Sequence, residues 1–259
     1  MKSELRCDWP NVQKILGNLL QLPAFTPSPK NNLLPRNPSQ VFRALNVVGD
    51  PSNVRLVIVG QDPYPRPASA VGLSFLDGAI TSFQDPRLAP SLRNIIKAIF
   101  ISRGLMTQDG TVQKVRDLCR EHLPDSPQDW ALNLSENCGV LWLNRSLTFE
   151  SKEPEVLKKH VTFWDPVLRK IIDEIVMARK AINKGVVFIL WGNKAAELIP
   201  VINKAASKVN LKNVKILRNI HPVLDEFPSK GVFQTLKEME ESIGIGVTDF
   251  LKCLVDETS

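Results

Sequence analysis

The sequence predicts an α/β fold built on a parallel sheet. Two observations support this prediction: four short apolar runs recur along the chain, and helix-compatible segments separate them. Each run is continuously apolar rather than alternating, as expected for strands buried on both faces of a parallel sheet. Strands that alternate with helices form βαβ units with right-handed crossovers. The runs are VRLVIVG (54–60), GVLWLN (139–144), GVVFILWG (185–192) and NVKILRNI (213–220).

Five segments between and after these runs are compatible with helices. They are Ser91–Arg103, Thr111–His122, Val161–Lys180, Ala195–Lys208 and Val232–Glu241. The stretch 25–40 is rich in Pro, Asn and Ser, so we expect an irregular arm that leads into a helix near Val41–Leu45. We find no internal repeat and no low-complexity linker, and we therefore expect a single domain over residues 1–259.

The composition is that of an ordinary globular protein, with 43% hydrophobic and 23% charged residues. No stretch is apolar enough for a membrane span, and the N-terminal MKSELRCDWP lacks the apolar region of a signal peptide. The four cysteines are scattered and form no CxxC pair, which argues against a zinc site and fits reduced thiols. We therefore expect an intracellular protein, in the cytoplasm of a prokaryote or in a nucleus or host cell.

The charge favours a polyanionic partner. The net charge is +6, and residues 152–237 hold 16 Lys or Arg against 8 Asp or Glu. A lysine-rich solvated surface would give the same numbers. Charge alone therefore supports nucleic-acid binding without establishing it.

Polar side chains follow each of the four predicted strands. Gln61, Asp62 and Tyr64 follow the first, Asn144 ends the second, Asn193 follows the third and His221 follows the fourth. Ligands of open α/β sheets bind beyond the carboxyl ends of the strands. We therefore expect these loops to meet at one edge of the sheet, although the strand order does not follow from the sequence.

The motifs at these strand ends resemble uracil-DNA glycosylase of the family-1 type. They are GQDPYP (60–65), GLSF (72–75), LNRSLT (143–148), FILWG (188–192) and HP (221–222), in the family's order. The resemblance extends from about Trp9 to Phe250. It implies a three-layer αβα fold with a central four-stranded parallel sheet, and a monofunctional hydrolase with no metal and no cofactor. It also implies a monomer that acts on uracil in single- or double-stranded DNA.

The resemblance assigns the chemistry to Asp62 and His221. A carboxylate below the sugar stabilises the positive charge that develops as the N-glycosidic bond breaks, and it orients a water. His221 would donate a hydrogen bond to the uracil oxygen as the base leaves as an anion, for which a neutral imidazole suffices. Outside this motif, Asp62 would be interpreted as a turn residue and His221 as a loop residue.

Four further residues are expected to hold the base. The amide of Asn144 can read the edge of uracil against the reversed pattern of cytosine, although an Asx turn is equally compatible with its position. Phe75 would stack on the flipped base, and Tyr64 would exclude the methyl group of thymine by its bulk. Gln61, beside Asp62 in the same motif, is expected to contact the substrate.

Pro90-Ser91-Leu92 resembles the family's proline-rich loop, with Ser91 as a helix N-cap whose neighbouring amides face a phosphate. Pro65, Asn193, Val223 and Leu224 are the other expected DNA contacts. Several of these positions depart from the family.

Pro65 replaces the family's histidine, Asn193 stands where a serine is common, and Val223 replaces a phosphate-binding serine. The apolar residue that wedges into the duplex falls at Asp225 unless Leu224 takes that role. Pro65 also resembles the divergent poxvirus branch, whose glycosylase doubles as a replication factor. These changes are expected to weaken binding of the DNA backbone more than they affect the reaction at the base.

Two alternatives remain open at this point. The chain could be a catalytically weak nucleic-acid-binding or replication-accessory protein on the same fold, or a glycosylase for a modified pyrimidine. The segment 104–137 is an insertion beyond the family pattern that could adapt the site or recruit a partner, but we expect it to be a solvated helical excursion. No protein partner is indicated.

Overall fold

The computed structural model describes residues 6–19 and 32–256. Its central sheet contains β1 (Leu56–Gly60), β2 (Val140–Asn144), β3 (Val186–Trp191) and β4 (Val214–Asn219). All neighbouring strands are parallel, in the order β2-β1-β3-β4. The predicted four-stranded parallel sheet is confirmed, and each strand lies inside its predicted run. The order reverses direction between β1 and β3, and this is where such sheets bind ligands.

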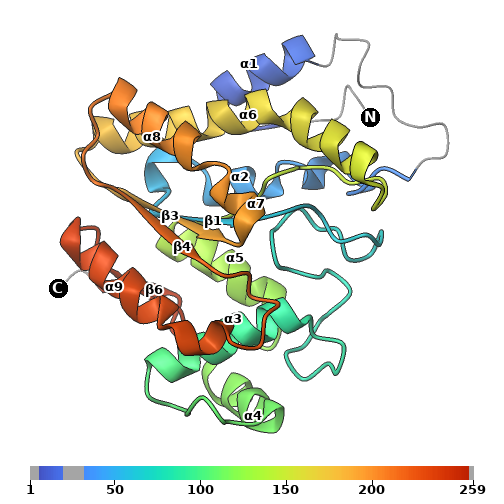
Figure 1. Ribbon diagram of the computed structural model, residues 1–259, viewed down its shortest axis with the longest axis vertical. Helices are drawn as coiled ribbons and strands as arrows, with labels where there is room; N and C mark the ends of the chain where they lie inside the picture. The colour runs from blue at the N-terminus through green and yellow to red at the C-terminus, as the bar shows by residue number, and fades with distance from the viewer. Residues whose placement is uncertain (1–5, 20–31, 257–259) are drawn as a thin grey trace.

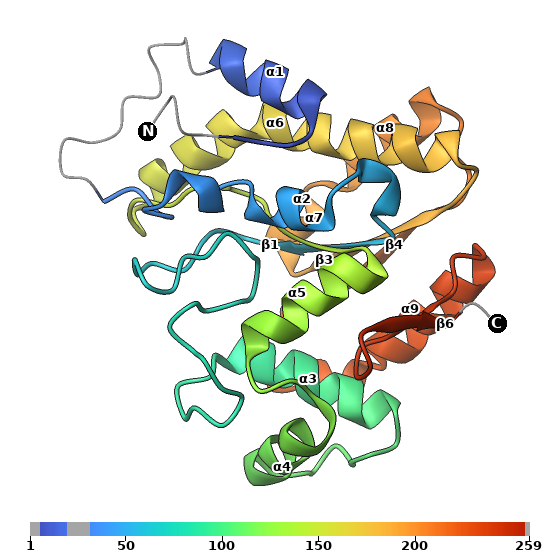
Figure 2. The same ribbon diagram turned by 180° about the vertical axis from the view of Figure 1, so that it is seen from behind.

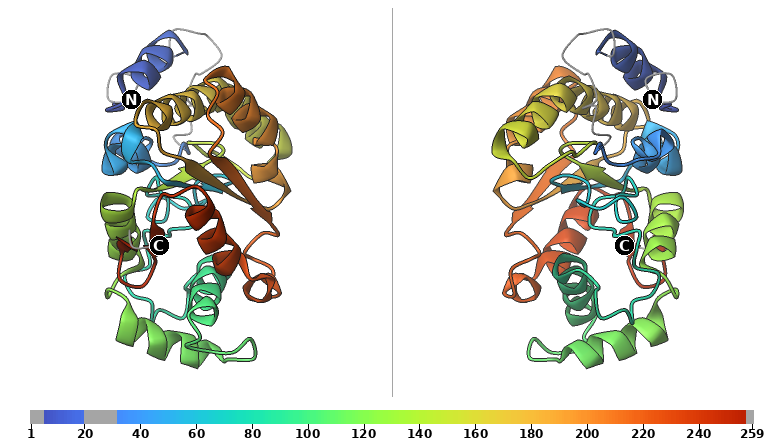
Figure 3. Two further views of the ribbon diagram at one scale, coloured as in Figure 1. Left: turned by 90° about the vertical axis from the view of Figure 1, so that its left-hand side faces the viewer. Right: turned by 90° about the vertical axis from the view of Figure 1, so that its right-hand side faces the viewer.

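Helices cover both faces of the sheet and make the three predicted layers (Figures 1 and 2). On one face lie α6 (Pro154–Ala181) and α8 (Ile199–Lys208), with α1 (Pro10–Leu19) packed on the outside of α6. On the other face lie α3, α5 and α9, and α4 lies beyond them at the opposite end of the molecule from α1 (Figure 3). The bounds of these four are α3 Pro90–Ser102, α4 Val112–His122, α5 Pro127–Cys138 and α9 Val232–Ser242.

Shorter elements complete the chain. The helix expected near Val41–Leu45 is α2 (Arg43–Val48), which packs against β2 and α5. The irregular arm is described only from residue 32 on, and its residues 25–31 lie outside the described part. The 3-10 turns are η2 (Pro38–Gln40), η3 (Pro51–Asn53) and η4 (Phe227–Lys230), and β5 (Val247–Asp249) pairs antiparallel with β6 (Leu254–Asp256). No helix among the described residues is long and apolar enough to cross a membrane.

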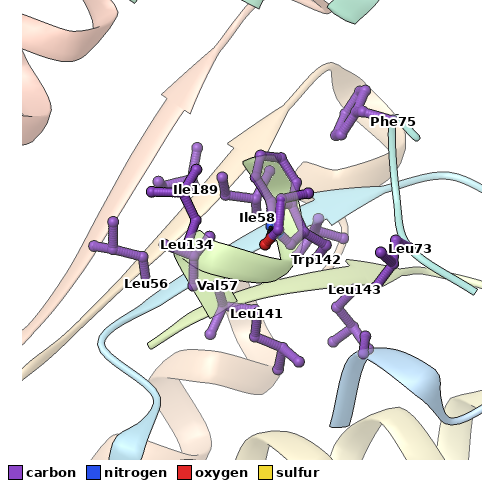
Figure 4. Close-up of a cluster of buried hydrophobic side chains, with 14 of the residues drawn as sticks. Leu56, Val57, Ile58, Leu73, Phe75, Leu134, Leu141, Trp142, Leu143 and Ile189 are labelled. Carbon is purple, nitrogen blue, oxygen red and sulfur yellow. Dashed lines mark hydrogen bonds between the residues drawn. The ribbon is translucent and has the colours of Figure 1, made fainter. Parts of the chain in front are cut away.

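The core lies on both sides of β1, β2 and β3, every residue of which is buried. Figure 4 shows Trp142 of β2 and Leu134 of α5 in the same cluster of buried hydrophobic side chains. The indole N–H of Trp142 donates to the carbonyl oxygen of Ala131 at 3.2 Å. This bond satisfies the one polar group of a fully buried side chain.

The fourth strand differs from its prediction, because β4 is not buried on both faces. It forms one edge of the sheet, and Leu217 is its only buried residue, whereas β2 at the other edge is buried throughout. The apolar run 213–220 contains Lys215 and Arg218, whose charges require solvent or a partner. An edge strand with charged residues also resists pairing with a second sheet.

Two helix predictions also change. The helix predicted from Val161 begins at Pro154, where a proline in the first turn needs no N–H partner. The helix predicted over Ala195–Lys208 is two helices, α7 (Asn193–Ala196) and α8, and Pro200 lies in the first turn of the second. Helices α1 and α5 were not predicted.

The prediction of a solvated excursion over residues 104–137 is wrong. Helix α5 starts there and supplies Trp130 and Leu134 to the core, both fully buried. Ser126 caps its start by accepting the N–H of Asp129 at 3.0 Å. The apolar residues of α5 recur four apart on one face, and that face lies on β2.

Candidate active site

A cavity of about 290 Å³ opens at the carboxyl ends of the strands. Eight of the residues predicted for the site line it, and they come from the loops after β1 and β4, from the end of β2, from the GLSF loop and from the start of α3. They are Gln61, Asp62, Tyr64, Pro65, Phe75, Ser91, Asn144 and His221. Asn193, Val223 and Leu224 do not line it. The expected convergence of strand ends therefore brings a carboxylate, two amides, a phenol and an imidazole to one place.

The ends of β1 and β2 are joined side by side. Gly60 and Asn144 are register partners, and the N–H of Arg145 donates to the carbonyl oxygen of Gly60 at 2.9 Å. A Cβ atom on Gly60 would lie 2.7 Å from Oδ1 of Asn144 and 2.8 Å from Cβ of Ser74. A side chain at residue 60 would therefore displace the amide of Asn144, so glycine is required by close approach.

Asp62 is half-buried in the cavity. Burial raises the pKa of its carboxyl to about 6, while a hydrogen bond from Gln61 and the charge of Lys152 act in the opposite direction. Nε2 of Gln61 donates to Oδ2 of Asp62 at 3.4 Å. The carboxylate is therefore ionised at neutral pH in a site that partly excludes water.

Lys152 lines the same cavity and was not predicted. It is an exposed lysine in the loop after β2, six residues beyond Ser146 and outside the motifs quoted above. Nothing in the sequence distinguishes it from the other lysines of the basic stretch 152–237. Its position becomes apparent only when the loops after β1 and β2 are seen together.

Phe75 has a left-handed backbone, with φ of 62°, which a phenylalanine adopts only when its surroundings impose it. The preceding residue is tied to the sheet, because the N–H of Ser74 donates to the carbonyl oxygen of Trp142 at 3.2 Å. The ring of Phe75 packs edge-on against Trp191 with centroids 5.7 Å apart. The loop thus presents one aromatic ring at the cavity wall.

Tyr64 lies beside this ring. Its hydroxyl is 3.5 Å from the carbonyl oxygen of Phe75, to which it donates. Burial and the nearby charge of Asp77 raise the pKa of Tyr64 to about 12, so the phenol stays neutral. Tyr64 and Phe75 therefore form adjoining walls of the cavity.

His221 lines the cavity next to Phe75, with the centroids of the two rings 6.0 Å apart. Its ring packs over Gly192, where a Cβ would lie 3.3 Å from Cδ2 of His221. The loop after His221 is tied to α3, because Nδ2 of the buried Asn94 donates to the carbonyl oxygens of Pro222 at 2.9 Å and Leu224 at 3.2 Å. Burial lowers the pKa of His221, so the imidazole is neutral.

Ser91 lies at the cavity but does not cap its helix. The N-cap of α3 is Ala89, with no side-chain hydrogen bond, and Pro90 takes the first helical position. The prediction of Ser91 as N-cap is therefore wrong, because the proline moves the start of the helix forward. Ser91 instead belongs to the first turn, whose N–H groups have no partner within the helix.

Three predicted DNA contacts lie beside the cavity rather than in it. Val223 and Leu224 are among the most exposed apolar residues described, at 49% and 45% of their surface. Asn193 is exposed at the start of α7 and lines a neighbouring cavity together with Leu224. Among the described residues, no three His, Cys, Asp or Glu side chains gather as a metal site requires.

A profile of the uracil DNA glycosylase superfamily matches residues 47–235. The chain belongs to this superfamily. A uracil-DNA glycosylase of Idiomarina loihiensis is 35% identical over 170 residues, which is 63% of this chain and 62% of that protein. Another, of Saccharomyces cerevisiae, is 31% identical over 175 residues, which is 66% of this chain and 42% of that protein. The chain thus aligns with about two fifths to three fifths of the length of these relatives.

Solved structures of the superfamily share the fold. The wild-type UNG from Nitratifractor salsuginis superposes with a TM-score of 0.69 at 24% identity, covering 98% of this chain and 94% of that one. The match covers a larger share of this chain than the superfamily profile, which spans residues 47–235.

Proposed function

We propose that this chain hydrolyses the N-glycosidic bond of uracil, or of a close uracil analogue, in DNA and leaves an abasic site. The observation that supports this most directly is the meeting of Asp62, Asn144 and His221 around one cavity of about 290 Å³. Membership of the superfamily and the relatives named uracil-DNA glycosylase point the same way. Water is the only co-reactant, so the reaction needs neither a metal nor a cofactor.

In this proposal Asp62 acts on the sugar. As the bond from C1′ to N1 breaks, positive charge develops on the sugar, and an ionised carboxylate beside it stabilises that charge. The same carboxylate orients the water that adds to C1′. The water's proton passes to solvent or to the carboxylate, and the abasic sugar keeps the hydroxyl. Lys152 keeps Asp62 ionised by opposing the effect of burial.

His221 acts on the leaving base. The bonding electrons stay on uracil, whose oxygen becomes negative, and a donor fixed in a poorly hydrated site stabilises that charge. A neutral imidazole is the suitable donor, because it makes the hydrogen bond without giving up its proton. Its pKa is lowered by burial, which keeps it neutral.

The base is recognised on its edge and on its face. Asn144 offers one donor and one acceptor, which match uracil and oppose cytosine. Phe75 stacks on the ring and Tyr64 occupies the space that a thymine methyl group would need, with Gln61 at the mouth of the site. Base flipping requires unstacking, which costs a few kcal/mol in duplex DNA.

The DNA backbone is held by the loops around the cavity. Ser91 and the N–H groups of the first turn of α3 bind a phosphate, while Pro65, Val223, Leu224 and Asn193 contact the strand around it. The basic stretch 152–237 attracts the polyanion, so affinity should fall as salt rises. We propose a monomer inside the cell, where DNA is the partner.

Release of free base from uracil-containing oligonucleotides, single- and double-stranded, tests the proposal. We expect free uracil, little or no release from thymine controls, and an abasic strand that stays intact until alkali is added. DNA binding without any base release would favour the replication-accessory alternative. Faster release of hydroxymethyluracil than of uracil would favour the modified-pyrimidine alternative. A covalent adduct trapped by borohydride would contradict the monofunctional reaction.

A further inference from the structure

His160 is a buried histidine that the proposed reaction does not use. It lies on α6, and only 8% of its surface is exposed. Its ring contacts the β2–α6 loop, which comprises residues 145–153. This loop follows Asn144 and includes Lys152, and both of these residues line the active-site cavity.

The ring of His160 accepts a hydrogen bond from the β2–α6 loop. Its Nδ1 lies 2.8 Å from Oγ1 of Thr148, which also accepts the indole N–H of Trp164 at 2.6 Å. An indole N–H is always a donor, so Oγ1 is left with its hydroxyl proton to donate elsewhere. Nδ1 is the only acceptor that residues 6–19 and 32–256 offer to this proton. The neutral ring therefore carries its own proton on Nε2.

Nε2 of His160 faces Glu150, two residues further along the loop. It lies 3.7 Å from Oε2 of this glutamate. Burial lowers the pKa of His160 by more than the charge of Glu150 raises it, so the imidazole is neutral at pH 7. One side chain of α6 thus contacts the loop at two residues.

Thr148 connects His160 to the loop that carries Asp62. The side chain of Thr148 is buried, and its carbonyl oxygen accepts the hydroxyl of Ser146 at 2.7 Å. The N–H of Ser146 donates to the carbonyl oxygen of Gln61 at 2.9 Å. The segment that His160 contacts is therefore hydrogen-bonded to the residue beside the proposed catalytic carboxylate.

Lys152 lies between this segment and the start of α6. Oγ of Ser151 accepts the N–H of Glu153 at 3.2 Å, one residue before the helix begins. The side chain of Lys152 is exposed, and in the described part of the chain it forms no ion pair and no hydrogen bond. Its position at the cavity therefore depends on the backbone of the β2–α6 loop.

We propose that His160 is a positioning residue, which keeps Lys152 at the active-site cavity where its charge acts on Asp62. The inference rests on the proposed function, which gives the ionised Asp62 its role at the sugar. Without the imidazole, the hydroxyl of Thr148 loses its acceptor and the carboxylate of Glu150 is released. A released Glu150 can pair with Lys152, two residues away, and this pair would weaken the effect of Lys152 on Asp62.

The test measures the titration of Asp62 directly, from the ¹³C signal of its carboxyl group. Asp62→Asn identifies this signal by removing it. His160→Leu removes both contacts of the ring and should raise the titration midpoint by about half or more of the rise that Lys152→Ala causes. The double variant should show no larger rise than Lys152→Ala alone, because His160 acts through Lys152 rather than independently of it.

Three further variants separate positioning from damage to the fold. His160→Asn keeps an acceptor near the position of Nδ1 and should return the midpoint towards the wild-type value. Thr148→Val keeps the shape of the side chain, removes the same hydrogen bond from its other end and should also raise the midpoint. His122→Leu removes a half-buried histidine of α4 outside the cavity and should leave the midpoint unchanged.

Two results would overturn the inference. One is a midpoint that stays at the wild-type value in His160→Leu, and the other is a double variant whose rise equals the sum of the two single rises. The titration needs no substrate, so it is separate from the proposed function. If the midpoint moves as expected but the wild-type protein releases no uracil, His160 positions Lys152 and the glycosylase proposal fails. Uracil release with an unmoved midpoint would retain the glycosylase proposal and remove His160 from this role.

Discussion

The backbone N–H of Val223 donates to Nδ1 of His221 at 3.1 Å. A backbone N–H is always a donor, so Nδ1 must be the acceptor and the proton of the neutral ring lies on Nε2. Val223 replaces a serine of the family motif, but this bond uses the backbone and survives the change. The loop thus keeps the tautomer that the proposed reaction needs while it loses a hydroxyl that would bind phosphate.

The first prediction concerns this tautomer. In ¹⁵N spectra of the three histidines, the resonances that disappear in His221→Gln identify the signals of His221. In the wild-type protein at pH 7, these signals should show a protonated Nε2 and an unprotonated Nδ1. The same variant should slow single-turnover uracil release by about 100-fold or more, as loss of a donor to a developing anion does. Binding of an abasic strand should change by less than about threefold. A ring protonated on Nδ1 would contradict the assignment.

The second prediction concerns Asp62. Asp62→Asn should reduce single-turnover cleavage by orders of magnitude while DNA binding survives, because the amide cannot balance positive charge on the sugar. A rate within about tenfold of wild type, or about 1.4 kcal/mol in barrier, would remove Asp62 from its proposed role.

Although Asp62→Asn should slow cleavage, it should raise the free energy of unfolding at high pH. Burial raises the pKa of the carboxyl from its ordinary 3.8 to about 6, so the folded state holds the proton more tightly than the unfolded state. The stability linked to this proton is complete below about pH 4 and is lost as pH rises through 6. Asn does not ionise, so Asp62→Asn should be more stable than wild type at pH 8, by on the order of 1–3 kcal/mol. Denaturant titrations should show this difference shrink towards pH 4.

The third prediction concerns Lys152. Its charge lowers the pKa of Asp62, so Lys152→Ala should move the acid limb of the profile of kcat/KM against pH to higher pH. Lys152→Arg should restore the limb. Lys159→Ala removes an equal charge from an exposed site on α6 outside the cavity and should leave it in place. An acid limb at the same pH in Lys152→Ala and wild type would show that Lys152 does not act on Asp62.

The strand ends explain why much of the site could be predicted. Asp62, Asn144 and His221 each follow an apolar run, and parallel strands deliver their carboxyl ends to one edge whatever their order. Lys152 was missed because its position depends on how two loops meet. The cap of α3 was placed at Ser91 because the sequence shows a serine after a proline, whereas Pro90 takes the first helical position and makes Ala89 the cap.

The wrong predictions for α5 and β4 have a related cause. Helix α5 was assigned to solvent because polar and charged residues, among them Asp129, Asn133 and Glu136, are interspersed with its buried residues. Its single apolar face becomes apparent only against β2. The edge position of β4 depends on the strand order, which no local pattern encodes, so Arg218 was included in a run expected to be buried.

The fourth prediction concerns the choice of base. Asn144→Asp should shift selectivity partly towards cytosine, because a carboxyl group presents a different set of donors and acceptors to the base. Tyr64→Ala should admit thymine, because it opens the space that the methyl group needs. Release rates from matched strands containing uracil, cytosine or thymine measure both effects.

Two matched variants control this experiment. Asn193→Asp changes an amide outside the active-site cavity and should keep uracil selectivity. Tyr64→Phe keeps the ring and should still exclude thymine. Strict uracil selectivity in Asn144→Asp and Tyr64→Ala, with activity intact, would mean that the base is read by other residues.

The last prediction concerns the contacts with the DNA backbone. Pro65 and Val223 supply no side-chain hydrogen bond where the family motif has a histidine and a serine, and polar contacts of that kind contribute ~1–3 kcal/mol each. Asp225 disfavours insertion beside phosphates, which leaves the exposed Leu224 as the candidate for the apolar wedge.

The loss of these contacts should therefore reduce base extrusion from a stable duplex most, because a single strand needs no unpairing. We expect kcat/KM to be higher on single-stranded uracil DNA, and we expect the ratio between the two forms to shrink when Pro65→His and Val223→Ser are combined. Leu224→Ala should lower kcat/KM on both forms. A wild-type preference for duplex would mean that Leu224 already acts as an effective wedge, and the interpretation of weakened backbone contacts would then be wrong.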